Sequence, residues 1–327
     1  MALAAAFGSP ALDAWWLELL RYLPYPIWLL PAVLAFALSL LLRWAWRVAA
    51  VLGLAVVAMV IMGLALGHAD AGTGRVRVMT YNIKAYLLRP QPEAFAPLEL
   101  EVARHAPDIL VMQDAGELTA LRRTMPGAAQ SIFVGRQVYA FDQYIVVSRY
   151  PLRDCHSGGM AVRGDGGAFV RCTVTADVVE FDLLTAHLLS PRGGLNATRR
   201  ERAEGLAEWQ KNVADRQAQA ALVASEVARR TRPIVVAGDL NAPEGSPVVQ
   251  GLLAHGLRDA FSAAGRGYGY THGHALQMRS ALRGSFLRID HILVSPELGI
   301  AGAFAGGKEA SEHRPVIADL LLHRAPD

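Results

Sequence analysis

Residues 234–243 read IVVAGDLNAP, and this stretch decides the fold. The first four residues form a short apolar run typical of a buried strand. Asp239 and Asn241 follow at once and project in alternation from an extended chain. A turn after a strand needs only one glycine or asparagine. Two polar side chains at this strand end therefore indicate a functional site.

Polar residues also stand at the ends of other predicted strands. They are Asn82 in the strand predicted at 75–83, Asp114 after 108–112, His187 after 178–185, Asp290 in 288–294, and Glu312 and His313 before 316–322. Taken singly, each is more simply a turn residue, a helix cap or half of a structural pair. Ligands bind where strand ends and loops converge on a rigid scaffold. The ordered set therefore predicts one site.

The order of elements predicts the fold class. Further strands are predicted at residues 144–147 and 169–174, and helices at 97–105 and 196–230. Runs of strands mixed with a few helices favour two packed sheets flanked by helices over a doubly wound sheet.

The N-terminal region is unusually apolar. The chain is 53% hydrophobic and 19% charged, with a mean hydropathy of +0.25, and the apolar excess lies before residue 72. Residues 27–42 and 48–66 carry no charge, and each is close to the ~20 residues of a spanning helix. We expect residues 1–70 to form a membrane anchor with two transmembrane helices. Arg43 and Arg47 between them predict a cytoplasmic turn, which places the following domain outside the cytoplasmic membrane, in the periplasm of a Gram-negative cell.

Two alternatives for this region stay open. The two runs could form a buried core hairpin of a soluble protein. Residues 69–71 also have the small-x-small form of a cleavage site, and processing there would release the domain. Residues 70–74, DAGTG, are expected to be a flexible link.

The motifs TYN, PDILVMQD, TAHL, GDLNAP, RIDHILVS and SEHRPV, in this order, resemble the endonuclease/exonuclease/phosphatase superfamily. The resemblance covers residues 75–322. It implies a four-layer α/β/β/α sandwich of two packed mixed sheets, with a catalytic domain at 75–327. It also implies a phosphoesterase that uses Mg²⁺ or Mn²⁺ and attacks the ester with water in line. Nucleic acid, a phospholipid headgroup and a small molecule all stay open as substrates, and no obligate protein partner is evident.

The resemblance implies a role for each residue at the strand ends. Asn82, His187 and Asn241 would bind the phosphate. Asp239 would orient or deprotonate the attacking water, and Asn241 stands beside it. Asp290 would fix the tautomer of His313, which would act as the acid or base.

The metal ligands implied by the resemblance are Asn82, Asp114 and Glu312. Here the sequence departs from the family, which has Glu at the position of Asp114 and Asp at the position of Glu312. Both keep a hard oxygen donor suited to Mg²⁺. We expect the exchanges to compensate, because one side chain is shorter and the other longer by a methylene; a weak or shifted metal preference is the alternative. If they instead abolish turnover, the chain is a non-catalytic module that binds a phosphate ligand.

The remaining signals are weaker. The net charge of +3 is carried after residue 74 and is too small for a dedicated nucleic-acid binder, although it does not exclude an anionic substrate. Cys155 and Cys172 could form one bridge or stay free. His272 and His274 are interpreted as surface residues rather than as part of the site.

Overall fold

Two packed sheets form the body of the protein. The computed structural model describes residues 14–88, 91–162, 167–274 and 284–324. Its main strands are β2 (Gly72–Asn82), β3 (Ile109–Gln113), β4 (Gln137–Phe141), β5 (Tyr144–Ser148), β6 (Leu152–Gly159), β7 (Ala168–Ala176), β8 (Val179–Ala186), β9 (Ile234–Asp239), β10 (Arg258–Asp259), β12 (Asp290–Val294), β13 (Gly299–Ala305) and β14 (Val316–Arg324). One sheet has the order β10-β12-β9-β8-β7-β6 and the other β13-β14-β2-β3-β5-β4.

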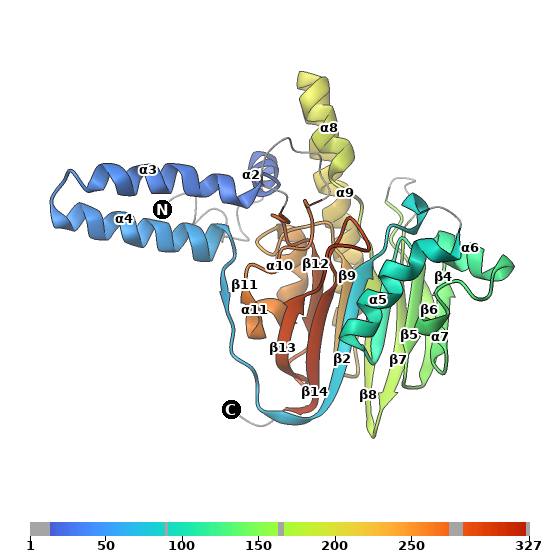
Figure 1. Ribbon diagram of the computed structural model, residues 1–327. Helices are drawn as coiled ribbons and strands as arrows, with labels where there is room; N and C mark the ends of the chain where they lie inside the picture. Colours follow the sequence, from blue (N-terminus) through green and yellow to red (C-terminus); the bar gives the residue numbers. More distant parts are fainter. Residues whose placement is uncertain (1–13, 89–90, 163–166, 275–283, 325–327) are drawn as a thin grey trace.

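Helices cover the outer face of each sheet (Figure 1). They are α5 (Ala96–His105), α6 (Gly116–Thr124) and α7 (Gln130–Phe133) on the β2 sheet, and α9 (Arg202–Ala228) and α10 (Pro247–Leu253) on the β9 sheet. Side chains alternate along each strand. Val78 therefore packs between the sheets, whereas Met79 packs outward under α5. This arrangement confirms the predicted four-layer sandwich.

Strand direction brings the polar strand ends together. β2 runs parallel to β3, and β8 runs parallel to β9, so their carboxyl ends share one end of the sandwich. β12 is antiparallel to β9, and β14 is antiparallel to β2, so their first residues lie at the same end. In the register, Asp290 stands opposite Asp239.

The N-terminal region is helical. Its elements are α2 (Trp15–Arg21), η1 (Tyr25–Trp28), α3 (Leu29–Ser39), α4 (Trp44–Val56) and the π-turn η2 (Val57–Ile61). α3 and α4 lie side by side and project away from the sheets (Figure 1). One helix, Trp44–Ile61, is long and apolar enough to cross a membrane, and the pair Trp15–Arg21 and Tyr25–Ser39 is bent by 101°.

The predicted ends of the apolar helices were wrong. The first helix ends at Ser39, and the second ends at Ile61. Beyond it, Ala65–Leu66 form strand β1, which pairs with β11 (Arg266–Gly267). Residues 65–66 are apolar like the helix before them, so hydropathy does not distinguish them from it. They form a strand because they pair with residues 266–267, which are distant in the chain.

Residues 70–74 are not a free link. Asp70 binds Arg258 and accepts a hydrogen bond from the Ile300 amide at 2.9 Å. β2 begins at Gly72, within the expected link. The predicted helix at 196–230 is two helices, α8 (Arg192–Arg200) and α9.

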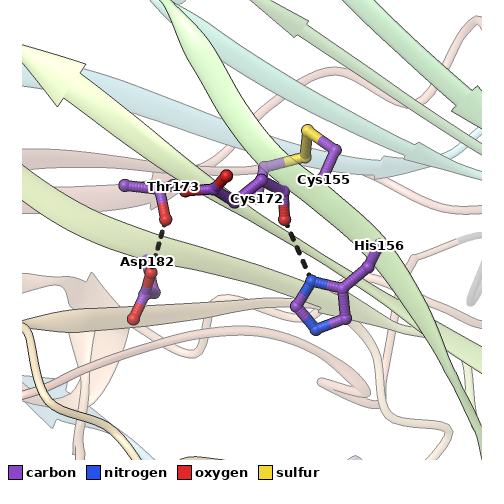
Figure 2. The surroundings of a disulfide bond; sticks show 6 residues. Cys155, His156, Cys172, Thr173 and Asp182 are labelled. Carbon is purple, nitrogen blue, oxygen red and sulfur yellow. Dashed lines mark hydrogen bonds between the residues drawn. A yellow bond between two sulfur atoms is a disulfide. The ribbon is translucent and has the colours of Figure 1, made fainter.

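The two cysteines form a disulfide. Figure 2 shows the bridge between Cys155 on β6 and Cys172 on β7, with Cα atoms 4.1 Å apart. Close by, Thr173 Oγ1 donates to Asp182 Oδ1 at 3.1 Å. Of the two open alternatives, the bridge is the one present.

Helix α2 belongs to the body of the protein. Leu17 is fully buried, and Glu18 forms buried ion pairs with Arg21 and with Arg216 of α9. The indole Nε1 of Trp209 donates to the carbonyl of Trp15 at 2.9 Å. The expected boundary at residue 70 therefore cuts through a packed unit.

Candidate active site

Asp239 lies at the centre of the polar cluster and is fully buried. The Asn82 amide Nδ2 donates to its Oδ2 at 2.9 Å, and the backbone amide of Asn241 donates to its Oδ1 at 2.9 Å. His187 Nε2 and His313 Nδ1 lie 3.5 and 3.7 Å from Oδ2. Burial by itself would raise the pKa of Asp239, but the neighbouring positive charges and the Asn82 hydrogen bond lower it to about 2. The group is therefore a carboxylate at neutral pH.

His313 is oriented by a second carboxylate. Its Nδ1 lies 3.0 Å from Asp290 Oδ2, and the ring is almost completely buried. Burial would lower the pKa of His313, but the charges of Asp290 and Asp239 outweigh it and raise the pKa above its usual value. Nδ1 bonded to a carboxylate carries the hydrogen, which leaves Nε2 for a substrate.

His187 is held by the β5 region. Its backbone amide donates to the Tyr144 hydroxyl at 2.8 Å, and its Nδ1 lies 2.6 Å from Gln143 Oε1. An amide oxygen only accepts, so we assign the ring hydrogen to Nδ1. The other ring nitrogen, Nε2, faces Asp239 Oδ2 at 3.5 Å.

Asp114 has a partner that the sequence did not predict. Lys84 Nζ donates to its Oδ2 at 2.9 Å, and His187 Nδ1 lies 3.5 Å from its Oδ1. Burial would lower the pKa of Lys84, but the charges of Asp239 and Asp114 raise it, so Lys84 is an ammonium at neutral pH. The only signal in the sequence was the position of Lys84, two residues after Asn82.

Glu312 points toward another element. Its carboxylate lies 3.6 Å from Arg192 Nη2 and is one-third exposed. Its neighbour Ser311 donates to the Asn82 carbonyl at 2.7 Å, which fixes the loop beside β2. Among the contacts of the described residues, none joins Glu312 to Asp114. The compensating exchange of the two acids therefore stays a prediction.

The donor chemistry suits a hard cation. Within the described ranges, one group of acidic and histidine side chains has ligand atoms within 4.8 Å of one another: Asp239, Asp290 and His313. In this group the His313 Nδ1 is bonded to Asp290, so it is unsuited to coordinate an ion. The Asp114 carboxylate is a hard donor that lines the cavity, and the Asn82 side-chain oxygen, which accepts from the Lys84 amide at 3.2 Å, is a second hard donor beneath it.

A cavity of about 1210 Å³ opens over the cluster. Its floor includes Lys84, Asp114, His187, Asn241 and His313. The Asn241 side chain is held there by its Nδ2, which donates to the Leu188 carbonyl at 2.8 Å. The predicted residues Asn82, Asp239 and Asp290 lie just beneath, joined to the floor by the contacts above, while Glu312 lies beside it.

Two histidines of the loop after residue 267 differ from the expectation. His272 lines the cavity, with its ring centroid 4.7 Å from that of His313. Burial and the His313 charge lower the pKa of His272 to about 3, so it is neutral. His274 instead binds Ser285 Oγ at 3.1 Å and the Ser311 carbonyl at 3.0 Å. The glycines around them, in GYGYTHGH at 267–274, are typical of an exposed loop, so the sequence did not predict that the two histidines are partly buried.

Helix α2 and the segment that follows it supply another part of the cavity. Leu19, Tyr22, Leu23 and Pro24 line it. The Tyr22 hydroxyl donates to the Asn241 carbonyl at 2.7 Å and accepts from the Arg216 guanidinium. The sequence placed these residues in a separate anchor, so their role in the site was missed.

Comparison with known proteins agrees with this arrangement. Residues 79–313 match the Endonuclease/Exonuclease/phosphatase family. No curated protein matches the chain in sequence. Three similar solved structures show the same fold at low identity, and members of the family generally depend on a divalent metal.

The first is an endonuclease/exonuclease/phosphatase from Beutenbergia cavernae, with a TM-score of 0.53, 18% identity, and coverage of 77% of this chain and 72% of that one. The second is D. rerio TDP2 complexed with a single-strand DNA product, with a TM-score of 0.56, 15% identity, and coverage of 75% and 98%. The third is a mannosyl-6-phosphatase from Bacteroides thetaiotaomicron, with a TM-score of 0.52, 15% identity, and coverage of 75% and 99%. With more than two thirds of its length matched, the chain belongs to the endonuclease/exonuclease/phosphatase family.

Proposed function

We propose that this protein is a membrane-anchored phosphoesterase that hydrolyses a phosphodiester or phosphomonoester with Mg²⁺ or Mn²⁺. The observation that carries the proposal is the contact of Asp239 with Asn82, His187 and His313 at the floor of one cavity. Strands β2 and β9 supply Asn82 and Asp239, and the segments after β8 and before β14 supply the two histidines.

Each residue of the site has a separate role in the proposed reaction. Asp239 is charged and central, so it orients the attacking water and accepts its proton. His187 and His313 present ring nitrogens, and Asn82 an amide, to the charge that develops on the phosphoryl oxygens. Asp290 keeps His313 in the tautomer that leaves Nε2 for the substrate.

Asp114 and Asn82 would hold the cation, and Glu312 would reach it if its pair with Arg192 opens. The bound cation would neutralise charge on the phosphate. Lys84 already supplies one positive charge at Asp114. It therefore adds to the attraction of an anionic ester into the cavity.

We also propose that α3 and α4 cross the cytoplasmic membrane and that the sandwich lies outside it. Arg43 and Arg47 stand near the turn between these helices, and positive turns stay in the cytoplasm. The Cys155–Cys172 bridge supports this orientation, because disulfides persist in oxidising compartments.

The test uses the full chain in detergent with bis-p-nitrophenyl phosphate, plasmid DNA and phospholipid. We expect turnover with Mg²⁺ or Mn²⁺ and none with chelator. Asp239→Asn and His313→Ala should each lower kcat/KM by about 10²-fold or more. The exposed residues Asp177 and His255 provide matched controls, Asp177→Asn and His255→Ala, which should retain activity.

Two outcomes would contradict the proposal. One is turnover that survives both site substitutions. The other is binding of phosphate esters without any turnover, which would identify the chain as a non-catalytic binding module.

A further inference from the structure

One side of the active-site cavity is apolar. Leu19, Leu23 and Pro24 from the N-terminal segment line it together with Leu195 of α8 and Phe286. At about 1210 Å³, the cavity is larger than a phosphate group and its immediate ester carbons require. The cavity therefore has room for an apolar part of the substrate next to the phosphate.

The apolar wall is rigidly attached to the site. Glu18 on α2 is almost completely buried and pairs with Arg216, whose side chain lies beneath Asn241. The Tyr22 hydroxyl binds the Asn241 carbonyl directly. The wall is thus joined to the active site by an ion pair and hydrogen bonds.

The wall continues onto the projecting helices. Leu23 is 37% exposed, Ile27 is 45% exposed and Leu30, in α3, is 67% exposed. Exposed apolar side chains thus follow the cavity residue Leu23 along the chain into η1 and α3. Exposed apolar surface of this kind marks contact with lipid or another apolar partner.

Cationic side chains line the same cavity, and two of them, Arg192 and Arg199, flank Leu195 on α8. Lys84 lines the cavity as well. A cavity lined by both cationic and apolar side chains complements an amphiphile with an anionic head. A nucleic acid would place its charged backbone against Leu19, Leu23 and Pro24, where charge is poorly solvated.

We propose that the substrate is a membrane lipid, with its phosphate ester on the His187–Asp239–His313 floor and the start of its hydrocarbon chains against Leu19, Leu23 and Pro24. This inference rests on the proposed phosphoesterase activity. It adds that α2 delivers the lipid from the bilayer side of the cavity.

The experiment uses the full chain in detergent and compares substrates that share a headgroup. Dioctanoyl phosphatidylglycerol, -ethanolamine and -choline are each measured against their deacylated glycerophosphodiesters and against a single-stranded oligonucleotide. For at least one headgroup, kcat/KM should be about tenfold or more higher for the acylated ester, because the wall buries its methylenes. A preference for the deacylated ester or the oligonucleotide would overturn the inference.

Binding provides a second readout that needs no metal. With chelator present, octyl phosphate should bind about tenfold more tightly than ethyl phosphate in calorimetry. Equal affinities would overturn the lipid assignment. If nothing is hydrolysed but octyl phosphate still binds more tightly, the proposed activity fails while the lipid site stands.

Leu23→Asp tests the wall itself. It should lower the ratio of lipid to bis-p-nitrophenyl phosphate kcat/KM by about tenfold, because a charge replaces apolar surface. Leu100→Asp on α5, also at an exposed leucine outside the cavity, should leave both rates unchanged. If Leu23→Asp does not fold, Leu23→Ser takes its place. An unchanged ratio of the two kcat/KM values in a folded variant would show that Leu23 does not contact the lipid.

Discussion

At the scale of single residues, the charge on His313 depends on Asp290. The raised pKa of His313 keeps the ring protonated to higher pH, so a reaction that needs the protonated ring loses rate only as pH rises through that pKa. Asp290→Asn removes the largest favourable charge. The alkaline limb of the kcat/KM profile should then move to lower pH. An unchanged limb in this variant would show that His313 does not control it.

The ion pair between Lys84 and Asp114 should weaken the binding of a divalent metal ion. A divalent ion at Asp114 would share its carboxylate with the ammonium at 2.9 Å and be repelled by it. Lys84→Met should therefore tighten Mn²⁺ binding by about tenfold, measured by electron paramagnetic resonance. Lys308→Met at an exposed lysine is the control. Weaker binding in Lys84→Met would mean that the lysine helps to organise the site.

At the scale of elements, the disulfide joins β6 and β7 across 17 residues. A loop of this length contributes about 3 kcal/mol by restricting the unfolded chain. The double variant Cys155→Ala, Cys172→Ala should lose about 2–4 kcal/mol in the free energy of unfolding, measured with urea. Activity at low temperature should be retained, because neither cysteine lines the cavity. Equal stability of the oxidised protein and the double variant would refute this contribution.

At the scale of the whole molecule, α2 is needed for a stable sandwich. A fragment of residues 75–327 would uncover Trp209 and Phe286 and leave the Arg216 charge without Glu18. Breaking a buried ion pair costs about 3–5 kcal/mol. We expect this fragment to bind a hydrophobic dye and to melt at a lower temperature than the full chain.

The matched control keeps α2 and removes only the projecting helices. It replaces residues 29–56 with a glycine-serine linker and should stay folded without detergent, because α3 and α4 expose most of their apolar side chains. A stable and active 75–327 fragment would show that α2 is dispensable.

The sequence predicted the inner strands well and the outer ones poorly. Residues 108–112 and 234–237 are dense apolar runs because β3 and β9 are buried on both faces. β4 is an edge strand with mostly exposed side chains, so it has no such pattern. β6 is also mostly exposed and does not alternate, and its antiparallel pairing with β7 is set by the tertiary structure.

By itself, the sequence determined the layered fold and the kinds of side chain at the strand ends, because strand periodicity and residue chemistry are local properties. Tertiary structure alone decided that Lys84 binds Asp114, that Glu312 turns to Arg192 and that α2 forms a wall of the cavity. Each of these contacts joins residues that are distant in the chain. Their geometry depends on strand register and helix docking, which no local pattern encodes.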